Sequence, residues 1–179
     1  MTDTTQHPTQ PDTQTAPPAP RDWGGLFTRG AVAGLVGGFA FILANMWYSD
    51  AHGKPAVAPF LAISTIFHGT DMPNLNQPTD VVVGLVTHFA LAMLFGIVFA
   101  LGVGILRLGR MPLLLVAAAL IYGIVLYVVN FQIIGRAFFP WFVNSKGPNQ
   151  GFEAWIHPVA YGLFLVPFLL TTGAARRHH

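Results

Sequence analysis

Residues 81–106 read VVVGLVTHFALAMLFGIVFALGVGIL and contain no Asp, Glu, Lys or Arg. About 20 apolar residues in a helix cross the ~30 Å hydrocarbon core of a bilayer, so this stretch predicts a transmembrane helix. Residues 26–48, 112–134 and 152–172 are three further long apolar stretches, with Arg29 in the first and Glu153 in the last. The apolar residues are continuous and do not alternate, which excludes a transmembrane β-barrel. The sequence therefore predicts an all-α polytopic membrane protein, a bundle of four transmembrane helices.

Composition supports a lipid environment. Hydrophobic residues make up 53% of the 179-residue chain and charged residues 9%, whereas soluble domains carry about 25% charged residues. The net charge of +2 is small and the basic residues are scattered, so nucleic acid is not an expected partner. The chain has no cysteine, which excludes disulfides and thiolate metal sites. The expected partners are the lipid bilayer and other membrane protein subunits or a second copy of the chain.

The rest of the chain divides around these helices. Residues 1–22 are rich in Thr, Gln and Pro and predict a disordered tail, because they cannot bury enough apolar surface to order themselves. They do not have the pattern of a signal peptide. Residues 23–173 form the predicted transmembrane domain, and residues 174–179 a short basic end. The apolar run at residues 56–67 is too short to span and predicts an interfacial or re-entrant helix.

The distribution of Lys and Arg predicts the orientation. Basic residues concentrate on the cytoplasmic side of membrane proteins. One side of the predicted bundle has three basic residues: Lys54, Arg136 and Lys146. The other side, which also has both chain ends, has six: Arg21, Arg29, Arg107, Arg110, Arg176 and Arg177. We therefore expect both termini in the cytoplasm.

Two stripes of small residues predict close helix packing. The first helix carries Gly30, Gly34 and Gly38, and the second carries a small residue or His88 at every fourth position: Gly84, His88, Ala92, Gly96, Ala100 and Gly104. Small residues let helix backbones approach each other in lipid. We expect the two stripes to be buried in helix contacts, against each other in the favoured arrangement and in a dimer interface in the alternative one.

Each predicted helix offers one polar side chain in its outer half. These four residues are Asn45, His88, Asn130 and His157, and two tyrosines, Tyr127 and Tyr161, are spaced to join them. One explanation is structural, because buried Asn and His often form hydrogen bonds between helices and set their register. The other is that the two imidazoles converge on a ligand.

Three kinds of ligand fit the second explanation. His88 and His157 could bind the iron of haem b from two sides, or hold a copper or zinc ion with His68 or His52 completing the shell. The third kind is a proton or a small solute, because imidazole titrates near physiological pH.

Glu153 lies four residues before His157, on the same helix face. A surface ion pair or a solvated helix cap is the favoured interpretation, and the alternative is that Glu153 orients or protonates His157. Because proline suits the first turn of a helix, Pro158 also suggests that the fourth helix begins near Trp155, which would place His157 at its mouth.

The segments THFA at residues 87–90 and FGIVFA at residues 95–100 resemble the second helix of the YagU-like family of small bacterial inner-membrane proteins. The order of elements from residue 30 to residue 172 is similar too. The resemblance implies a four-helix protein of the bacterial cytoplasmic (inner) membrane, with no established reaction. His88 matches the histidine of the family's second helix and His157 that of its last helix, although the His157–Pro158 pair departs from the family pattern.

No motif of a hydrolase, metalloprotease or nucleotide-binding enzyme is present in the sequence. We therefore expect a non-catalytic accessory subunit or assembly factor of a larger membrane complex. A haem- or metal-binding redox protein is one alternative, and an oligomeric channel or transporter for protons or a small solute is another.

Overall fold

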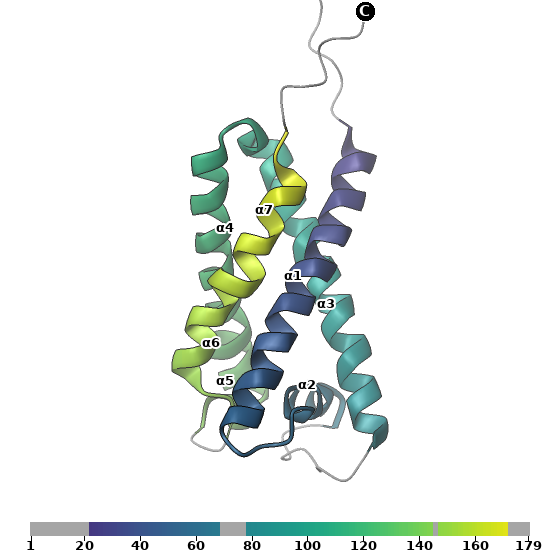
Figure 1. The fold of residues 1–179 in the computed structure, drawn as a ribbon, viewed down its shortest axis with the longest axis vertical. Coiled ribbons are helices and arrows are strands. Elements are labelled where there is room, and N and C mark those ends of the chain that lie inside the picture. Colours follow the sequence, from purple (N-terminus) through teal and green to yellow (C-terminus); the bar gives the residue numbers. More distant parts are fainter. Residues whose placement is uncertain (1–21, 69–77, 145–146, 172–179) are drawn as a thin grey trace, which may run out of the picture.

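The computed structural model describes residues 22–68, 78–144 and 147–171, apart from the side chains of His68 and Pro78, and these residues form a helical bundle (Figure 1). Most of the predicted tail and the basic end at 174–179 lie outside the described residues. The elements in chain order are α1 (Trp23–Ala51), α2 (Ala58–His68), α3 (Pro78–Leu106), η1 (Leu108–Arg110), α4 (Pro112–Tyr127), η2 (Val128–Gly135), α5 (Arg136–Phe138), η3 (Pro140–Val143), α6 (Gln150–Ile156), η4 (His157–Gly162) and α7 (Leu163–Leu169).

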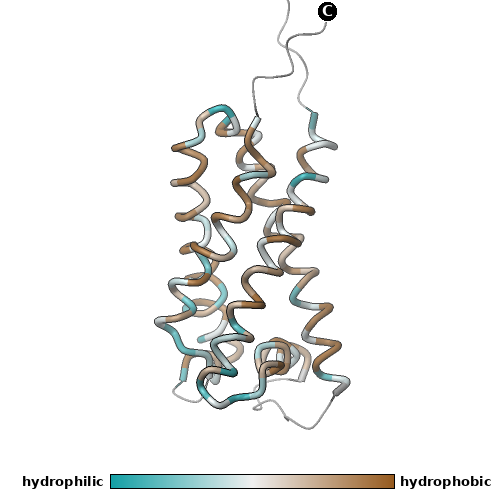
Figure 2. Tube along the Cα trace, in the orientation of Figure 1, coloured by the Kyte–Doolittle hydropathy of each residue, from teal (hydrophilic) through white to brown (hydrophobic). Residues whose placement is uncertain are grey.

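Four helical stretches are long and apolar enough to cross a membrane, as predicted, and they suggest a multi-pass protein in a lipid bilayer. They are Trp23–Ala51, Thr79–Leu106, Pro112–Phe138 and Gln150–Leu169. No strand occurs among the described residues, which confirms the all-α prediction. Apolar residues predominate along these helices, while hydrophilic residues gather at both ends of the bundle and in the half nearer α2 (Figure 2).

Local interactions explain where the helices begin and end. Asp22 caps α1 by accepting a hydrogen bond from the Gly25 amide at 2.8 Å. Pro112 opens α4, where its missing N–H costs no helical hydrogen bond. The last helix ends at Leu169, short of the predicted residue 172, because the Thr171 amide donates instead to the Gly109 carbonyl at 2.8 Å.

The third and fourth spans each contain a π-helical segment that the sequence did not predict. In η4 the Leu163 amide donates to the Pro158 carbonyl five residues earlier, which is the π-helical pattern. Pro158 therefore lies inside a continuous helix from Gln150 to Leu169, and the alternative helix start near Trp155 is wrong. The segment η2 widens the third span in the same way at residues 128–135.

The small-residue stripes of α1 and α3 lie against each other. A Cβ added to Gly30 would lie 2.7 Å from the Ala100 Cβ, and one added to Gly38 would lie 2.5 Å from the Ala92 Cβ. Gly84 differs from the prediction, because it faces the backbone of Phe60 in α2 instead of α1. The stripes are thus occupied within one chain.

The short helix α2 lies across one end of the bundle, where Figure 1 shows it end-on. It packs mainly on α3, and its residues Leu61, Ser64 and Thr65 are fully buried. The two hydroxyl groups donate to carbonyl groups of α2 itself, Ser64 to Leu61 at 2.8 Å and Thr65 to Ala62 at 2.6 Å. This end, which we call the α2 end, is opposite the end at which α1 begins and α7 finishes (Figure 1).

Candidate functional site

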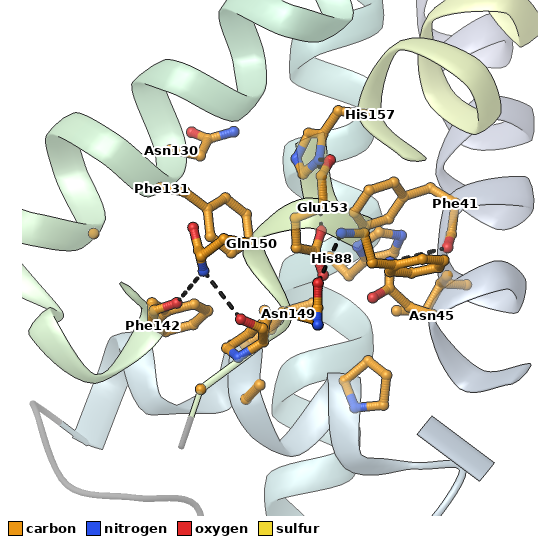
Figure 3. Close-up of a pocket in the computed structure, with 18 of the residues that line it drawn as sticks. Phe41, Asn45, His88, Asn130, Phe131, Phe142, Asn149, Gln150, Glu153 and His157 are labelled. Atoms are coloured by element: carbon orange, nitrogen blue, oxygen red, sulfur yellow. Dashed lines mark hydrogen bonds and ion pairs between the residues drawn. The ribbon is translucent and has the colours of Figure 1, made fainter. Parts of the chain in front are cut away.

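A cavity of about 1080 Å³ occupies the half of the bundle nearer the α2 end. All four spans contribute to its walls, together with α2 and η3. Figure 3 shows Asn130, Phe131 and Gln150 on one side of this cavity and Phe41, Asn45 and His88 on the other, with Glu153 and His157 in the middle. The predicted polar residues Asn45, His88, Asn130, His157 and Tyr161 all line it.

The other half of the bundle is filled by apolar side chains. Residues of α3, α4 and α7 make this core, including Phe99, Val103, Leu115, Leu165 and Leu169. Two tyrosines lie where the core meets the cavity: Tyr122 donates to the Phe95 carbonyl at 2.8 Å and Tyr161 to the Ala92 carbonyl at 2.6 Å. The cavity therefore ends near the middle of the bundle.

Each histidine of the cavity uses one ring nitrogen on a backbone carbonyl. Nε2 of His88 lies 2.8 Å from the Gly38 oxygen, and Nδ1 of His157 lies 2.7 Å from the Glu153 oxygen. Both side chains are buried. Phe41 contacts both imidazoles, with ring centroids 5.9 Å from His88 and 4.7 Å from His157. The two rings are thus held in place by α1 and by the helix turn before η4.

Glu153 is 4% exposed, so the predicted surface ion pair or solvated cap is wrong. Its Oε2 has no hydrogen-bond partner among the described residues and lies 3.5 Å from Nδ1 of His157. The hydrogen bond of that nitrogen goes to the backbone carbonyl of Glu153, so the carboxyl group does not orient the ring in the predicted way. Nε1 of Trp141, another buried residue of the cavity wall, is also without a hydrogen-bond partner among the described residues.

A chain of amides that sequence reasoning missed supports one wall of the cavity. Gln150 donates to the carbonyls of Phe142 at 2.7 Å and Pro148 at 3.0 Å. Its Oε1 accepts from Gln132 at 3.0 Å and from the Tyr127 hydroxyl at 3.3 Å. Tyr127 therefore acts behind the cavity wall and is not one of its lining residues. Gln132 was detectable in the sequence as a polar residue among apolar neighbours, whereas Gln150 ends the polar segment at residues 144–150 and has no such signal.

The other residues of the predicted site differ in their positions and hydrogen bonds. Asn45 donates to the Phe41 carbonyl at 3.3 Å, which satisfies part of its amide. The Asn130 side chain lines the cavity and makes no hydrogen bond to a described residue. The side chain of His68, proposed as a metal ligand, lies outside the described residues, and His52 accompanies Tyr48 at the mouth of the cavity.

The metal-binding prediction finds little support in this geometry. Among the residues whose side chains are described, no three of His, Cys, Asp and Glu are grouped closely enough to hold a metal ion. Because a carbonyl oxygen can only accept, Nε2 of His88 must carry hydrogen and is not available as a metal or haem ligand in this arrangement. The nitrogens left as possible ligands are Nδ1 of His88 and Nε2 of His157.

Comparison with known proteins adds no name to this arrangement. No protein-family model matches the chain, and no curated protein or solved structure is significantly similar to it. The resemblance to the YagU-like family stays a prediction.

Proposed function

We propose that this chain is a non-catalytic membrane protein that binds one amphipathic, lipid-like molecule in the cavity between its helices. The observation that carries this proposal is the cavity itself: about 1080 Å³, with mainly apolar and aromatic walls and a few buried polar groups. Small-molecule sites are typically concave, of roughly 300 to 1,000 Å³, and have this composition. The chain would hold such a molecule as an accessory subunit or assembly factor of a larger membrane complex.

The depth of the cavity supports an amphipathic occupant. Leu91 is thirteen residues from the start of α3 at Pro78, so it lies about 20 Å along the helix, near the middle of a bilayer. The polar residues Asn45 and His157 are closer to the α2 end, six residues before Ala51 and seven after Gln150. A ligand with its polar group near these residues would extend an apolar chain toward Leu91.

We propose that the molecule enters the cavity from lipid, between α3 and η2. Leu91 of α3 and Val129 and Ile134 of η2 all line the cavity. Ile134 is also 39% exposed. A lipid-soluble molecule could therefore pass between these two helices without first entering water.

The alternatives from the sequence have less support. A channel within one chain would need a path through the half of the bundle that Phe99, Val103 and Leu165 fill, and the oligomeric channel stays a prediction. Nδ1 of His88 and Nε2 of His157 are left as possible ligands of a haem or metal, but no three of His, Cys, Asp and Glu are grouped to hold a metal ion among the residues whose side chains are described. Dimerisation through the glycine stripes would need faces that α1 and α3 already use. Other outward faces of the bundle stay available to partner subunits.

A blocked cavity tests the proposed function. Leu91→Trp combined with Val129→Trp places two indole rings in the cavity, in the space that the ligand would occupy. Binding should therefore weaken roughly tenfold or more, which corresponds to a loss of about 1.4 kcal/mol or more. The control is Leu94→Trp with Val125→Trp, because these residues of the same spans are 51% and 46% exposed. The measurement is saturable binding of tritiated dodecanol to protein in phosphatidylcholine nanodiscs. Equal binding by the blocked and control proteins would refute the cavity as the binding site.

We further propose that the α2 end faces away from the cytoplasm of a bacterial inner membrane. Arg29, Arg107 and Arg110 lie toward the opposite end, which fits the cytoplasmic enrichment of basic residues. Because the chain has no cysteine, single cysteines can report the orientation. Asp50→Cys should react with a membrane-impermeant maleimide in intact cells, and Met111→Cys should react only after the membrane is opened. The reverse pattern would overturn this orientation.

A further inference from the structure

The hydrogen bonds of the two histidines determine what their other ring nitrogens can do. A backbone carbonyl cannot donate, so Nε2 of His88 and Nδ1 of His157 must each carry the hydrogen of their bonds to Gly38 and Glu153. In a neutral imidazole the second nitrogen is then an acceptor. Both histidines on the cavity wall therefore have an acceptor nitrogen left, Nδ1 in His88 and Nε2 in His157.

Other polar groups of the wall have the same character. Glu153 contributes the buried Oε2 that has no hydrogen-bond partner among the described residues. The Tyr161 hydroxyl uses its hydrogen on the Ala92 carbonyl, so its oxygen is left as an acceptor. Asn45 likewise uses its amide nitrogen on Phe41, which leaves its Oδ1. The polar layer therefore has several acceptors around the carboxyl group, beside two donors without a hydrogen-bond partner among the described residues, the Trp141 N–H and the Asn130 amide.

Aromatic rings surround this layer. Phe41 and Phe131 both pack edge-on against His157, with centroid distances of 4.7 and 5.5 Å, and both line the cavity. The face of an aromatic ring attracts a cation electrostatically, and the attraction is larger where water is excluded. Acceptors, a carboxyl group and aromatic faces together are suited to a positively charged donor.

We propose, resting on the proposed function, that the ligand is a lipophilic amine whose ammonium group donates hydrogen bonds to Glu153 and to the acceptor nitrogens of His88 and His157. An apolar chain gains little by leaving lipid for the cavity, because lipid is already apolar. Affinity and selectivity therefore come from the polar end. An ammonium group supplies three donors and the charge opposite to a carboxylate. Lys54, the one Lys or Arg on the described part of the cavity lining, is exposed and forms no ion pair with Glu153.

Three tritiated probes with the same chain test this proposal: dodecylamine, dodecanol and dodecanoate, each bound to the full chain in phosphatidylcholine nanodiscs. The protein blocked at Leu91 and Val129 supplies the background from partition into lipid. Because a hydrogen bond to a charged group is stronger than a neutral one, dodecylamine should bind about tenfold or more tightly than dodecanol. Dodecanoate should bind most weakly, because its charge has the same sign as that of the Glu153 carboxylate.

Glu153→Gln should remove the preference for dodecylamine over dodecanol, because it removes the charge and keeps the size of the side chain. Glu153→Asp should keep the preference. Equal binding of the amine and the alcohol by the unmodified protein, or tightest binding of dodecanoate, would overturn the amine proposal and leave the proposed function standing. No saturable binding of any probe above the blocked protein would overturn the proposed function itself.

Discussion

Gly96→Leu should prevent the bundle from forming its native packing, with a loss of stability of about 3 kcal/mol or more. Gly96 lies where α3 crosses α1, and a Cβ at this position would lie 2.5 Å from the Cα of Gly34 and 2.6 Å from its nitrogen. Those atoms belong to a helix backbone, which cannot move aside as a flexible side chain can. The two helices would have to separate, which would also open the contacts at Gly30 and Gly38.

The matched control for this change is Gly102→Leu. Gly102 is in the same helix, and a Cβ added there would meet no atom within 4 Å. Thermal unfolding in mild detergent, followed by circular dichroism and by size-exclusion chromatography, measures both proteins. We expect Gly102→Leu to unfold like the unmodified protein and Gly96→Leu to unfold at a much lower temperature or to aggregate. An unchanged melting temperature for Gly96→Leu would show that the α1–α3 contact does not form as described.

The sequence predicted the features of this fold that depend on repeated local patterns. Long apolar runs identified the four helices, and four-residue spacing identified the stripes that join α1 to α3. Gly84 belongs to the stripe in the sequence but packs against α2 instead of α1, because the backbone of Phe60 lies next to it. Periodicity shows which face of a helix is buried and does not show which neighbour buries it.

The π-helical segments could not be predicted from these local patterns. Pro158 suggested a helix start, since proline is common in the first turn. The structure accommodates this proline inside the span because η4 has a wider turn, and because Gly123 of α4 leaves room for its backbone: a Cβ there would lie 2.6 Å from the Pro158 nitrogen. That contact joins residues far apart in the sequence, so the local pattern around Pro158 contains no sign of it.

The candidate site was predicted in part. Depth along each helix correctly indicated a group of polar residues that line one cavity, including Asn45, His88 and His157. The direction in which each imidazole points was harder to predict, because contacts between helices determine it. Phe41 packs on both rings, and a backbone carbonyl accepts a hydrogen bond from one nitrogen of each. The burial of Glu153 was not predicted either. A residue near the start of a helix is expected to be exposed to solvent, and the sequence does not show which segments cover it.

The second large effect should be a gain in stability at Glu153. A buried polar atom without a partner costs about 1 to 3 kcal/mol, and Oε2 of Glu153 is such an atom among the described residues. Glu153→Met keeps a similar volume and removes the unsatisfied oxygen, so the ligand-free protein should gain about 1 to 3 kcal/mol. The backbone carbonyl of residue 153 remains, and with it the hydrogen bond that holds His157.

Gln150→Met is the control for that gain, because it makes the same kind of change three residues away at a polar group that is satisfied. Gln150 donates to the carbonyls of Phe142 and Pro148 and accepts from Gln132, so its loss leaves several groups unpaired and should cost about 1 to 3 kcal/mol. Melting temperatures of the ligand-free proteins should therefore move in opposite directions, up for Glu153→Met and down for Gln150→Met. A lower melting temperature for Glu153→Met would show that the carboxyl group stabilises the empty bundle. A higher one, accompanied by lost dodecylamine binding, would mean that Glu153 is kept at the expense of stability because the bound molecule needs it.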